Sequence, residues 1–303
     1  MRKFRLAALA MLFIFSVKAQ EKQILTSDSV QLYVNVKGKG IPCLYIHGGP
    51  GSGSYWMEKF FGDYLEQHFQ MVYLDQRGVG RSSSPADKNF SLERIVADFE
   101  EVREALGIKQ WLTLGHSFGG ILQMAYTEQF PASTRGMLML NCTLSMAESF
   151  CNSWIPRASE FLGMEKPAAC PDEPNEILAK MITLIQGLRG KDIMWKMSVA
   201  LAENEHKLDA TYSEIPNWNN DFAAVALGME EFWRDFRKQT VQVKIPVLFF
   251  YGHSDWMIGP EHYKGIAFPH MMLRSSNVGH LPFLESRADL EKAISEFLKK
   301  YKL

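Results

Sequence analysis

Runs of consecutive apolar residues alternate along this chain with segments whose apolar residues recur at helical spacing. Short continuous runs are typical of strands buried on both faces, and longer periodic segments are typical of amphipathic helices. The pattern predicts a half-exposed strand over 30–36 and buried strands over 42–46, 71–74, 111–114, 136–141, 245–251 and 271–274. It predicts helices over 91–106, with Ser91 as N-cap, and over 121–130, 260–266 and 287–301. Buried strands alternating with helices form a mostly parallel sheet that is covered on both faces.

The alternation stops between residues 143 and 240, where helical spacing dominates and large apolar side chains such as Trp154, Trp195 and Trp233 recur. A segment that interrupts a sheet and later returns to it is expected to be an insertion. We therefore predict an α/β fold, a doubly wound and mostly parallel sheet over 20–142 and 241–303, with an inserted helical cap over 143–240.

The amino terminus has a different pattern. Arg2, Lys3 and Arg5 precede the twelve residues 6–17, of which only Ser16 is polar, and small residues follow at a suitable cleavage position. This arrangement predicts a secretory signal peptide over 1–19, because the apolar part is too short to span a bilayer. We expect export to the periplasm or the medium, with no stable membrane insertion after cleavage.

Charge and motif spacing exclude several classes of function. The formal net charge is −1, and it becomes −5 once the four basic residues of 1–19 are removed, so no basic surface for nucleic acid is expected. The glycine-rich segment 47–51 is not followed by Gly-Lys-Ser/Thr, which excludes a phosphate loop. No paired histidines have metal-binding spacing. We expect neither a cofactor nor a metal.

The four cysteines fit no metal-binding pattern either. Cys43 and Cys142 lie in apolar, strand-like runs and are expected to be buried thiols. Cys151 and Cys170 lie in the irregular part of the cap, where an exported protein could join them or leave them free.

Candidate chemistry centres on Gly115-His116-Ser117-Phe118-Gly119, which fits G-x-S-x-G. A predicted strand precedes it and a predicted helix follows it, which is the context of a nucleophile elbow. Small residues are needed on both sides because the turn is strained and crowded. Ser117 is therefore the candidate nucleophile.

Two further side chains follow predicted strands in the order expected of a hydrolase triad. Asp255 comes just after the strand 245–251, and His280 follows the strand 271–274. Ligands bind at the carboxyl ends of the strands in open α/β sheets. We expect His280 to act as general base toward Ser117, with Asp255 orienting its imidazole. The loop 47–51 would present a backbone N–H group to the developing oxyanion, whereas Asp75 and Arg77 are interpreted as loop architecture.

Three motifs together carry a family resemblance: HGGPG at 47–51, DQRGVGRS at 75–82 and GHSFGG at 115–120. The chain resembles the proline iminopeptidase family of α/β-hydrolases over most of its mature length. The resemblance implies removal of an N-terminal residue, typically proline, from small peptides. It implies oxyanion donors at the Phe118 backbone and at one glycine of the loop, Gly48 rather than Gly49.

The resemblance also implies cap glutamates that hold the substrate's free ammonium group. Glu203 is the candidate, within Ala202-Glu203-Asn204-Glu205-His206, although Glu205 interrupts the family's Glu-Asn-His order. Glu230 and Glu231 are further possibilities, and a solvated helix face is the alternative interpretation of each. Two other functions stay open: a carboxylesterase or lactonase that uses the same triad on small neutral esters, and a catalytically inactive binding protein.

Overall fold

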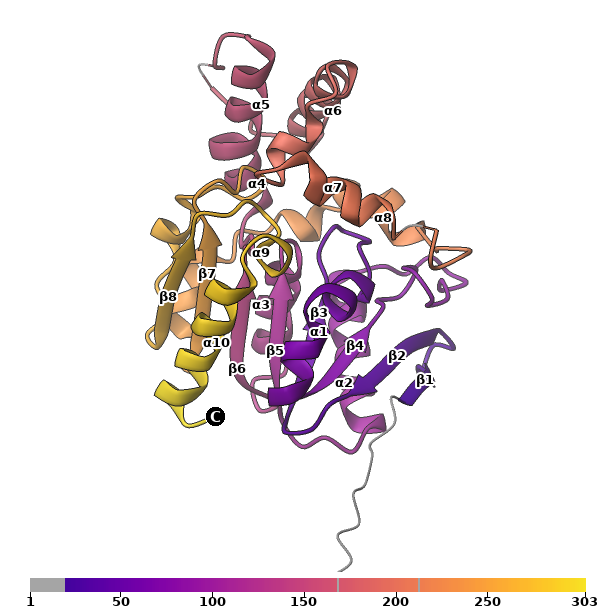
Figure 1. Cartoon of the computed structure of the whole chain (residues 1–303). Helices are drawn as coiled ribbons and strands as arrows, with labels where there is room; N and C mark the ends of the chain where they lie inside the picture. Colours follow the sequence, from indigo (N-terminus) through magenta and orange to yellow (C-terminus); the bar gives the residue numbers. More distant parts are fainter. Residues whose placement is uncertain (1–19, 168, 212) are drawn as a thin grey trace, which may run out of the picture.

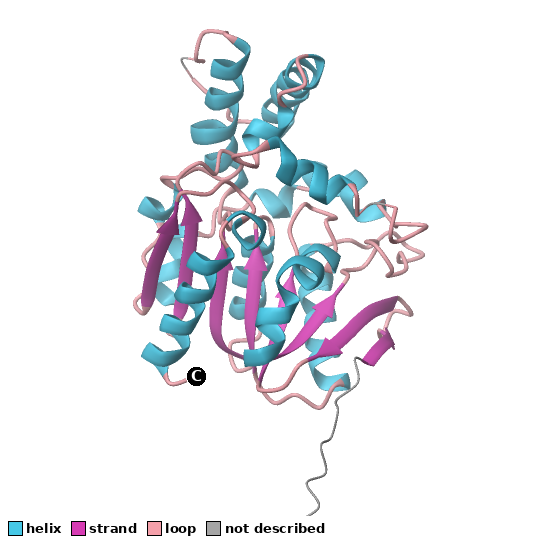
Figure 2. Ribbon diagram, viewed as in Figure 1, coloured by secondary structure: helices cyan, strands magenta, loops and turns pink. Residues whose placement is uncertain are grey.

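The computed structural model describes residues 20–303 except 168 and 212, so the predicted signal peptide lies outside the described residues. An eight-stranded sheet forms the centre of the described chain, in the order β1-β2-β4-β3-β5-β6-β7-β8 (Figures 1 and 2). The strands β3 to β8 pair in parallel, whereas β1 and β2 are antiparallel to their neighbours. The strands are β1 (Gln20–Leu25), β2 (Gln31–Lys37), β3 (Ile41–Ile46), β4 (Phe69–Leu74), β5 (Trp111–His116), β6 (Thr134–Leu140), β7 (Val247–Gly252) and β8 (Met271–Ser276).

Helices cover both faces of this sheet, as the apolar pattern predicts. The helices α1 (Tyr55–His68) and α10 (Arg287–Tyr301) bury their apolar sides in one core, and α2 (Leu92–Ala105) and α3 (Gly119–Gln129) bury theirs in the other. Alternate residues of β3 enter opposite cores, so that Tyr45 faces α1 while Leu44 faces the other side. The fold class predicted from the sequence is confirmed.

Two elements of the core were not predicted. Helix α1 buries Met57, Phe61 and Leu65, whose spacing of four residues is a helical signal that the loop-like start of this region obscures. The edge strand β1 buries only Ile24, so it lacks the alternation by which a strand is recognised. The predicted helix over 260–266 is shorter, a 3₁₀ turn η6 (His262–Gly265). A one-turn helix α9 (Pro282–Glu285) precedes α10.

The segment between β6 and β7 is helical and lies above the carboxyl ends of the strands (Figure 1). It consists of α4 (Met146–Ser149), the π-helix η1 (Phe150–Trp154), α5 (Ile155–Leu162), α6 (Pro174–Gly190), η2 (Met194–Met197), α7 (Ala202–Asp209), α8 (Asp221–Val225), η3 (Ala226–Gly228), η4 (Glu230–Trp233) and η5 (Arg237–Gln242).

This cap has two differently anchored parts. The helices α5 and α6 pack on each other around a small core of their own, and a disulfide joins Cys151 to Cys170 beside it. Phe222, Phe232 and Phe236 instead belong to the core that the sheet forms with α2 and α3. The second part of the cap is therefore continuous with the core of the sheet domain. The free cysteines Cys43 and Cys142 are buried, as expected.

Candidate active site

Ser117 occupies a sharp turn between β5 and α3. Its φ of +57° lies in the left-handed region, which is costly for a residue with a side chain and is typical of a strained functional turn. There is no room for a side chain at the flanking glycines. A Cβ atom on Gly115 would lie 2.1 Å from Oε1 of Gln123, and one on Gly119 would lie 2.3 Å from the carbonyl oxygen of Ile46. The G-x-S-x-G spacing therefore reflects steric necessity.

Asp255 and His280 meet at the same edge of the sheet, on the loops after β7 and β8. Nδ1 of His280 lies 3.1 Å from each carboxylate oxygen of Asp255, and both side chains are buried. Burial by itself would raise the pKa of Asp255, but the charge and hydrogen bond of His280 outweigh it and hold that pKa below 3.8. The ionised carboxylate accepts a hydrogen bond from Nδ1–H, which leaves Nε2 as the nitrogen that can take a proton from a hydroxyl.

Asn141 fixes this pair, and the sequence reasoning missed it. Its side-chain Nδ2 donates to Oδ2 of Asp255 at 2.7 Å and to the carbonyl oxygen of Gly279 at 2.9 Å. One amide thus ties the loop of the acid to the loop of the base. Asn141 follows β6 with a φ of +48°, a conformation that asparagine adopts more readily than most residues. The sequence signal that could have identified Asn141 is an asparagine at the carboxyl end of a predicted strand.

His116, the variable residue before Ser117 in the G-x-S-x-G motif, also positions His280. Its Nε2 donates to the carbonyl oxygen of His280 at 2.8 Å, and the two imidazole rings lie 4.7 Å apart between centroids. Burial and the neighbouring charge of His280 lower the pKa of His116 to about 3, so its ring stays neutral near pH 7. Ser117 is the next residue in the chain, so this contact ties the strand end that carries the candidate nucleophile to the loop that carries the candidate base. Among the described residues, the Ser117 hydroxyl makes no hydrogen bond; such contacts commonly tighten when substrate binds.

The backbone of Gly48 lies against the elbow. A Cβ atom on Gly48 would lie 2.6 Å from Cβ of Ser117 and 3.3 Å from the backbone nitrogen of Phe118, whereas one on Gly49 would point at the backbone nitrogen of Gly51, 2.5 Å away. Within the described part of the chain, the N–H groups of Gly48, Gly49 and Phe118 have no acceptor. Unpaired N–H groups beside a nucleophile are the donors that an oxyanion requires.

The motif at 75–82 holds this loop in place. Oδ1 of Asp75 accepts hydrogen bonds from the backbone nitrogen and the hydroxyl of Ser54 at 2.8 and 2.7 Å. Gln76 donates its backbone N–H to Nε2 of His47 at 3.1 Å and its side-chain amide to the carbonyl of His47 at 3.0 Å. Arg77 is buried in an ion pair with Asp98 at 2.6 Å. Asp75 and Arg77 thus have the architectural role expected of them.

Glu203, the candidate for substrate binding, is on the surface of α7. Its side chain is 67% exposed, and its carboxylate lies 3.4 Å from Nζ of Lys207. Glu230 and Glu231 are exposed as well. These surroundings resemble a solvated helix face more than the dry pocket in which a carboxylate binds an ammonium group strongly.

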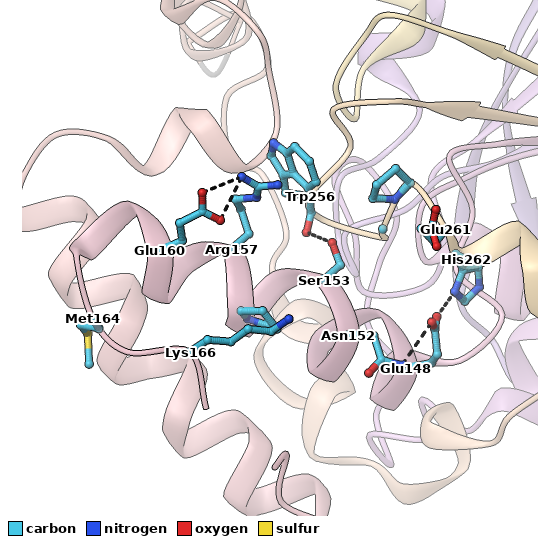
Figure 3. A pocket seen from close by; sticks show the side chains of 13 residues that line it. Glu148, Asn152, Ser153, Arg157, Glu160, Met164, Lys166, Trp256, Glu261 and His262 are labelled. Carbon is cyan, nitrogen blue, oxygen red and sulfur yellow. Dashed lines mark hydrogen bonds and ion pairs between the residues drawn. The ribbon is translucent and has the colours of Figure 1, made fainter. Parts of the chain in front are cut away.

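A cavity of about 380 Å³ lies beside the acid loop, between α5 and the residues that follow Asp255 (Figure 3). Four of the titratable side chains in its walls form two pairs. The guanidinium of Arg157 stacks 3.5 Å above the Trp256 ring and pairs with Glu160 at 3.1 Å, and the buried His262 pairs with Glu148. The backbone N–H of Leu144 donates to Nε2 of His262, so the contact with Glu148 uses the proton on Nδ1.

Residues 20–303, apart from 168 and 212, contain no group of three His, Cys, Asp or Glu side chains arranged to hold a metal ion. No helix in the same part of the chain has the length and apolar character that crossing a membrane requires.

Comparison with known proteins gives a consistent result. Residues 42–166 match the family model described as the alpha/beta hydrolase fold. A proline iminopeptidase from Neisseria gonorrhoeae is 38% identical over 117 residues, which span 37% of this chain and 37% of that relative. A solved proline iminopeptidase-related protein from Thermus thermophilus aligns over 93% of this chain and 98% of its own, with a TM-score of 0.76 and 21% identity. An esterase from Thermogutta terrifontis aligns with a TM-score of 0.69 and 22% identity over 93% and 99% of the two chains.

The topology of the sheet, the family match and the solved structures show that the chain has the α/β-hydrolase fold. Its sequence similarity supports the proline iminopeptidase family within that class, which confirms the resemblance carried by the three motifs. The similarity of sequence covers from 30% to 39% of the length of these relatives, and the likeness to the solved structures concerns the fold.

Proposed function

We propose that the chain is a serine hydrolase that forms an acyl-enzyme on Ser117. The observation that carries the proposal is the pairing of His280 with the buried Asp255 at 3.1 Å, beside a serine held at a φ of +57°. In this mechanism Ser117 attacks a carbonyl carbon while Nε2 of His280 takes its proton. The N–H groups of Gly48 and Phe118 stabilise the oxyanion, and His280 returns the proton to the leaving group. Water activated by the same imidazole then releases the acid.

The preferred substrate class is a peptide with a free amino terminus, from which one residue is removed. Similarity to a proline iminopeptidase over 117 residues of the chain, together with the motifs HGGPG and DQRGVGRS, supports this proposal. Glu203 would then hold the free ammonium group. The exposure of Glu203 favours the second candidate, a carboxylesterase or lactonase that acts on neutral esters with the same three residues.

A test of the nucleophile separates a hydrolase from a binding protein. We expect Ser117→Ala to lower kcat on the order of 10⁶-fold, by analogy with removal of the subtilisin serine, and to abolish labelling by a fluorophosphonate probe. Ser213→Ala, at an exposed serine of the cap, is the matched control and should keep the parent kcat and the labelling by the probe. Turnover by Ser117→Ala at the parent rate would refute the assignment.

A substrate panel separates the two hydrolase candidates. Aminoacyl β-naphthylamides and short p-nitrophenyl esters should be compared on the parent and on Glu203→Gln. Loss confined to the amine-bearing substrates in the variant would support the peptidase, whereas ester turnover with no release from any free-amine substrate would support the esterase.

A further inference from the structure

A second cavity, of about 420 Å³, opens where the cap meets the loop that carries Gly48. Its walls include Pro50 and Gly51 of that loop, Tyr55 and Trp56 at the start of α1, and Trp218 and Ala223 of the cap. None of the lining residues that the structure describes is an aspartate, glutamate, lysine, arginine or histidine. A hollow of this size with aromatic walls and few polar groups is typical of a small-molecule site.

The cavity adjoins the oxyanion loop along the chain. Its wall begins at Pro50, two residues after Gly48, whose backbone lies against Ser117. The backbone nitrogen of Ser52 donates to the carbonyl oxygen of Gly48 at 3.1 Å, which folds the wall back toward the elbow. Only Gly49 separates Gly48 from Pro50, so the path along the loop from a carbonyl group held at Gly48 to this wall is short.

The aromatic walls are held in place before any ligand arrives. The edge of the Trp218 ring fits against Gly53, where a Cβ atom would lie only 2.4 Å from Cη2 of the indole. Nε1 of Trp56 donates to the hydroxyl of Thr211 at 2.9 Å, which links α1 to the cap. A pocket whose walls are already ordered binds with a smaller entropic cost than one that must form around its ligand.

The cavity beside the acid loop is a poorer site for the same group. Its walls carry the Arg157–Glu160 and Glu148–His262 pairs (Figure 3). The lining residue that adjoins a member of the proposed triad in the chain is Trp256, which follows Asp255 and not Ser117. An uncharged substituent would desolvate these ions without compensating them.

We propose that the cavity lined by Tyr55, Trp56 and Trp218 is a specificity subsite for an uncharged aromatic group attached to the scissile carbonyl. This inference rests on the proposed acyl-enzyme chemistry at Ser117 and adds the substrate class: esters or amides with an aryl-bearing substituent on the side of the oxyanion loop. In a peptide the occupant is an aromatic side chain, and in an ester it is an aryl-bearing acyl or alkoxy group.

The test fills the cavity with a tryptophan side chain and measures the selectivity for aryl substrates. Ala223 lines it and faces Gly51, so Ala223→Trp places a ring in the space that the substrate group would use. The readout is the ratio of kcat/KM for an aryl substrate to that for its methyl counterpart, measured for p-nitrophenyl phenylacetate against acetate and for benzyl acetate against methyl acetate. We expect at least one ratio to fall tenfold or more. Gln242→Trp places the same ring in a cavity behind α3 and should leave both ratios unchanged.

Tyr55→Leu provides a second, milder variant if the tryptophan prevents folding. It removes one aromatic wall and should lower the same ratio several-fold. Both ratios within twofold of the parent in a folded variant would overturn the subsite while leaving the hydrolase proposal intact. Failure of the parent to react with a small alkyl fluorophosphonate would instead overturn the acyl-enzyme chemistry, and the subsite with it.

Discussion

Two buried histidines should make this fold sensitive to mild acid. His47 begins the loop that carries Gly48, and His116 directly precedes Ser117. Burial lowers the pKa of His47 to about 4 and that of His116 to about 3, from an ordinary value of 6.5. Each neutral ring makes a hydrogen bond through Nε2. That of His47 accepts from the backbone N–H of Gln76, and that of His116 donates to the carbonyl oxygen of His280.

The size and sign of the effect follow from linkage between folding and proton binding. The unfolded chain binds a proton at each histidine near pH 6.5, whereas the folded chain does so only near pH 4 and pH 3. The stability that these groups contribute is therefore complete above about pH 6.5 and is lost as the pH falls toward the folded values. Between pH 7 and pH 5 each histidine accounts for a loss of about 2 kcal/mol, and the two together for about 4 kcal/mol. Asp255, with its pKa held below 3.8, contributes little in this window.

The assay is thermal and urea unfolding at pH 7 and pH 5. At roughly 2 °C per kcal/mol for a chain of this size, the Tm should fall by about 8 °C. His116→Gln keeps an amide donor for the His280 carbonyl but does not titrate, so it should remove about half of the pH dependence. His206→Gln, at an exposed position on α7, is the matched control. A parent Tm that is the same at both pH values, or an unchanged pH dependence in His116→Gln, would refute the reasoning.

Three further predictions concern the acid, a buried ion pair and the cap. Asp255→Asn should keep the fold but lower kcat on the order of 10⁴-fold, because an amide favours the wrong tautomer of the His280 imidazole. Activity at the parent level in a steady-state assay would contradict this prediction. Arg77→Met should cost about 3–5 kcal/mol in urea unfolding, because it leaves Asp98 as a buried charge without its main partner, and the Arg77→Met, Asp98→Leu double variant should recover part of that loss. Replacing Cys151 and Cys170 with serine should lower the free energy of unfolding by about 3 kcal/mol, the value expected for closing a loop of this length; an unchanged Tm would show that the bond constrains little.

Much of the core was predictable because its signals are local. Buried strands that alternate with helices indicate a parallel sheet, and the glycines around Ser117 are needed within the turn itself. The chain order of Ser117, Asp255 and His280, each after a strand, predicted that they approach one edge of the sheet. Helix α1 and strand β1 escaped prediction for equally local reasons, since one starts in a glycine-rich stretch and the other is mostly exposed.

The positioning contacts depend on tertiary packing. Asn141 lies 114 residues from Asp255 and 138 from Gly279, and His116 lies 164 residues from the carbonyl that it holds. No periodicity or spacing in the sequence links such distant groups, because sheet order and loop packing determine which of them meet. The pairing of Cys151 with Cys170 was open for the same reason.

Apolar periodicity and the order of residue types were enough to predict the class of fold and the groups able to do chemistry. Which neighbours hold those groups, and which surfaces surround them, became clear only in three dimensions. The structure exposes Glu203 on α7 and leaves an uncharged aromatic cavity beside the oxyanion loop, because the packing of the cap against the 50–56 region brings Trp218 to Tyr55. Contacts between segments this far apart arise from the packing of the whole chain, which a single sequence does not display.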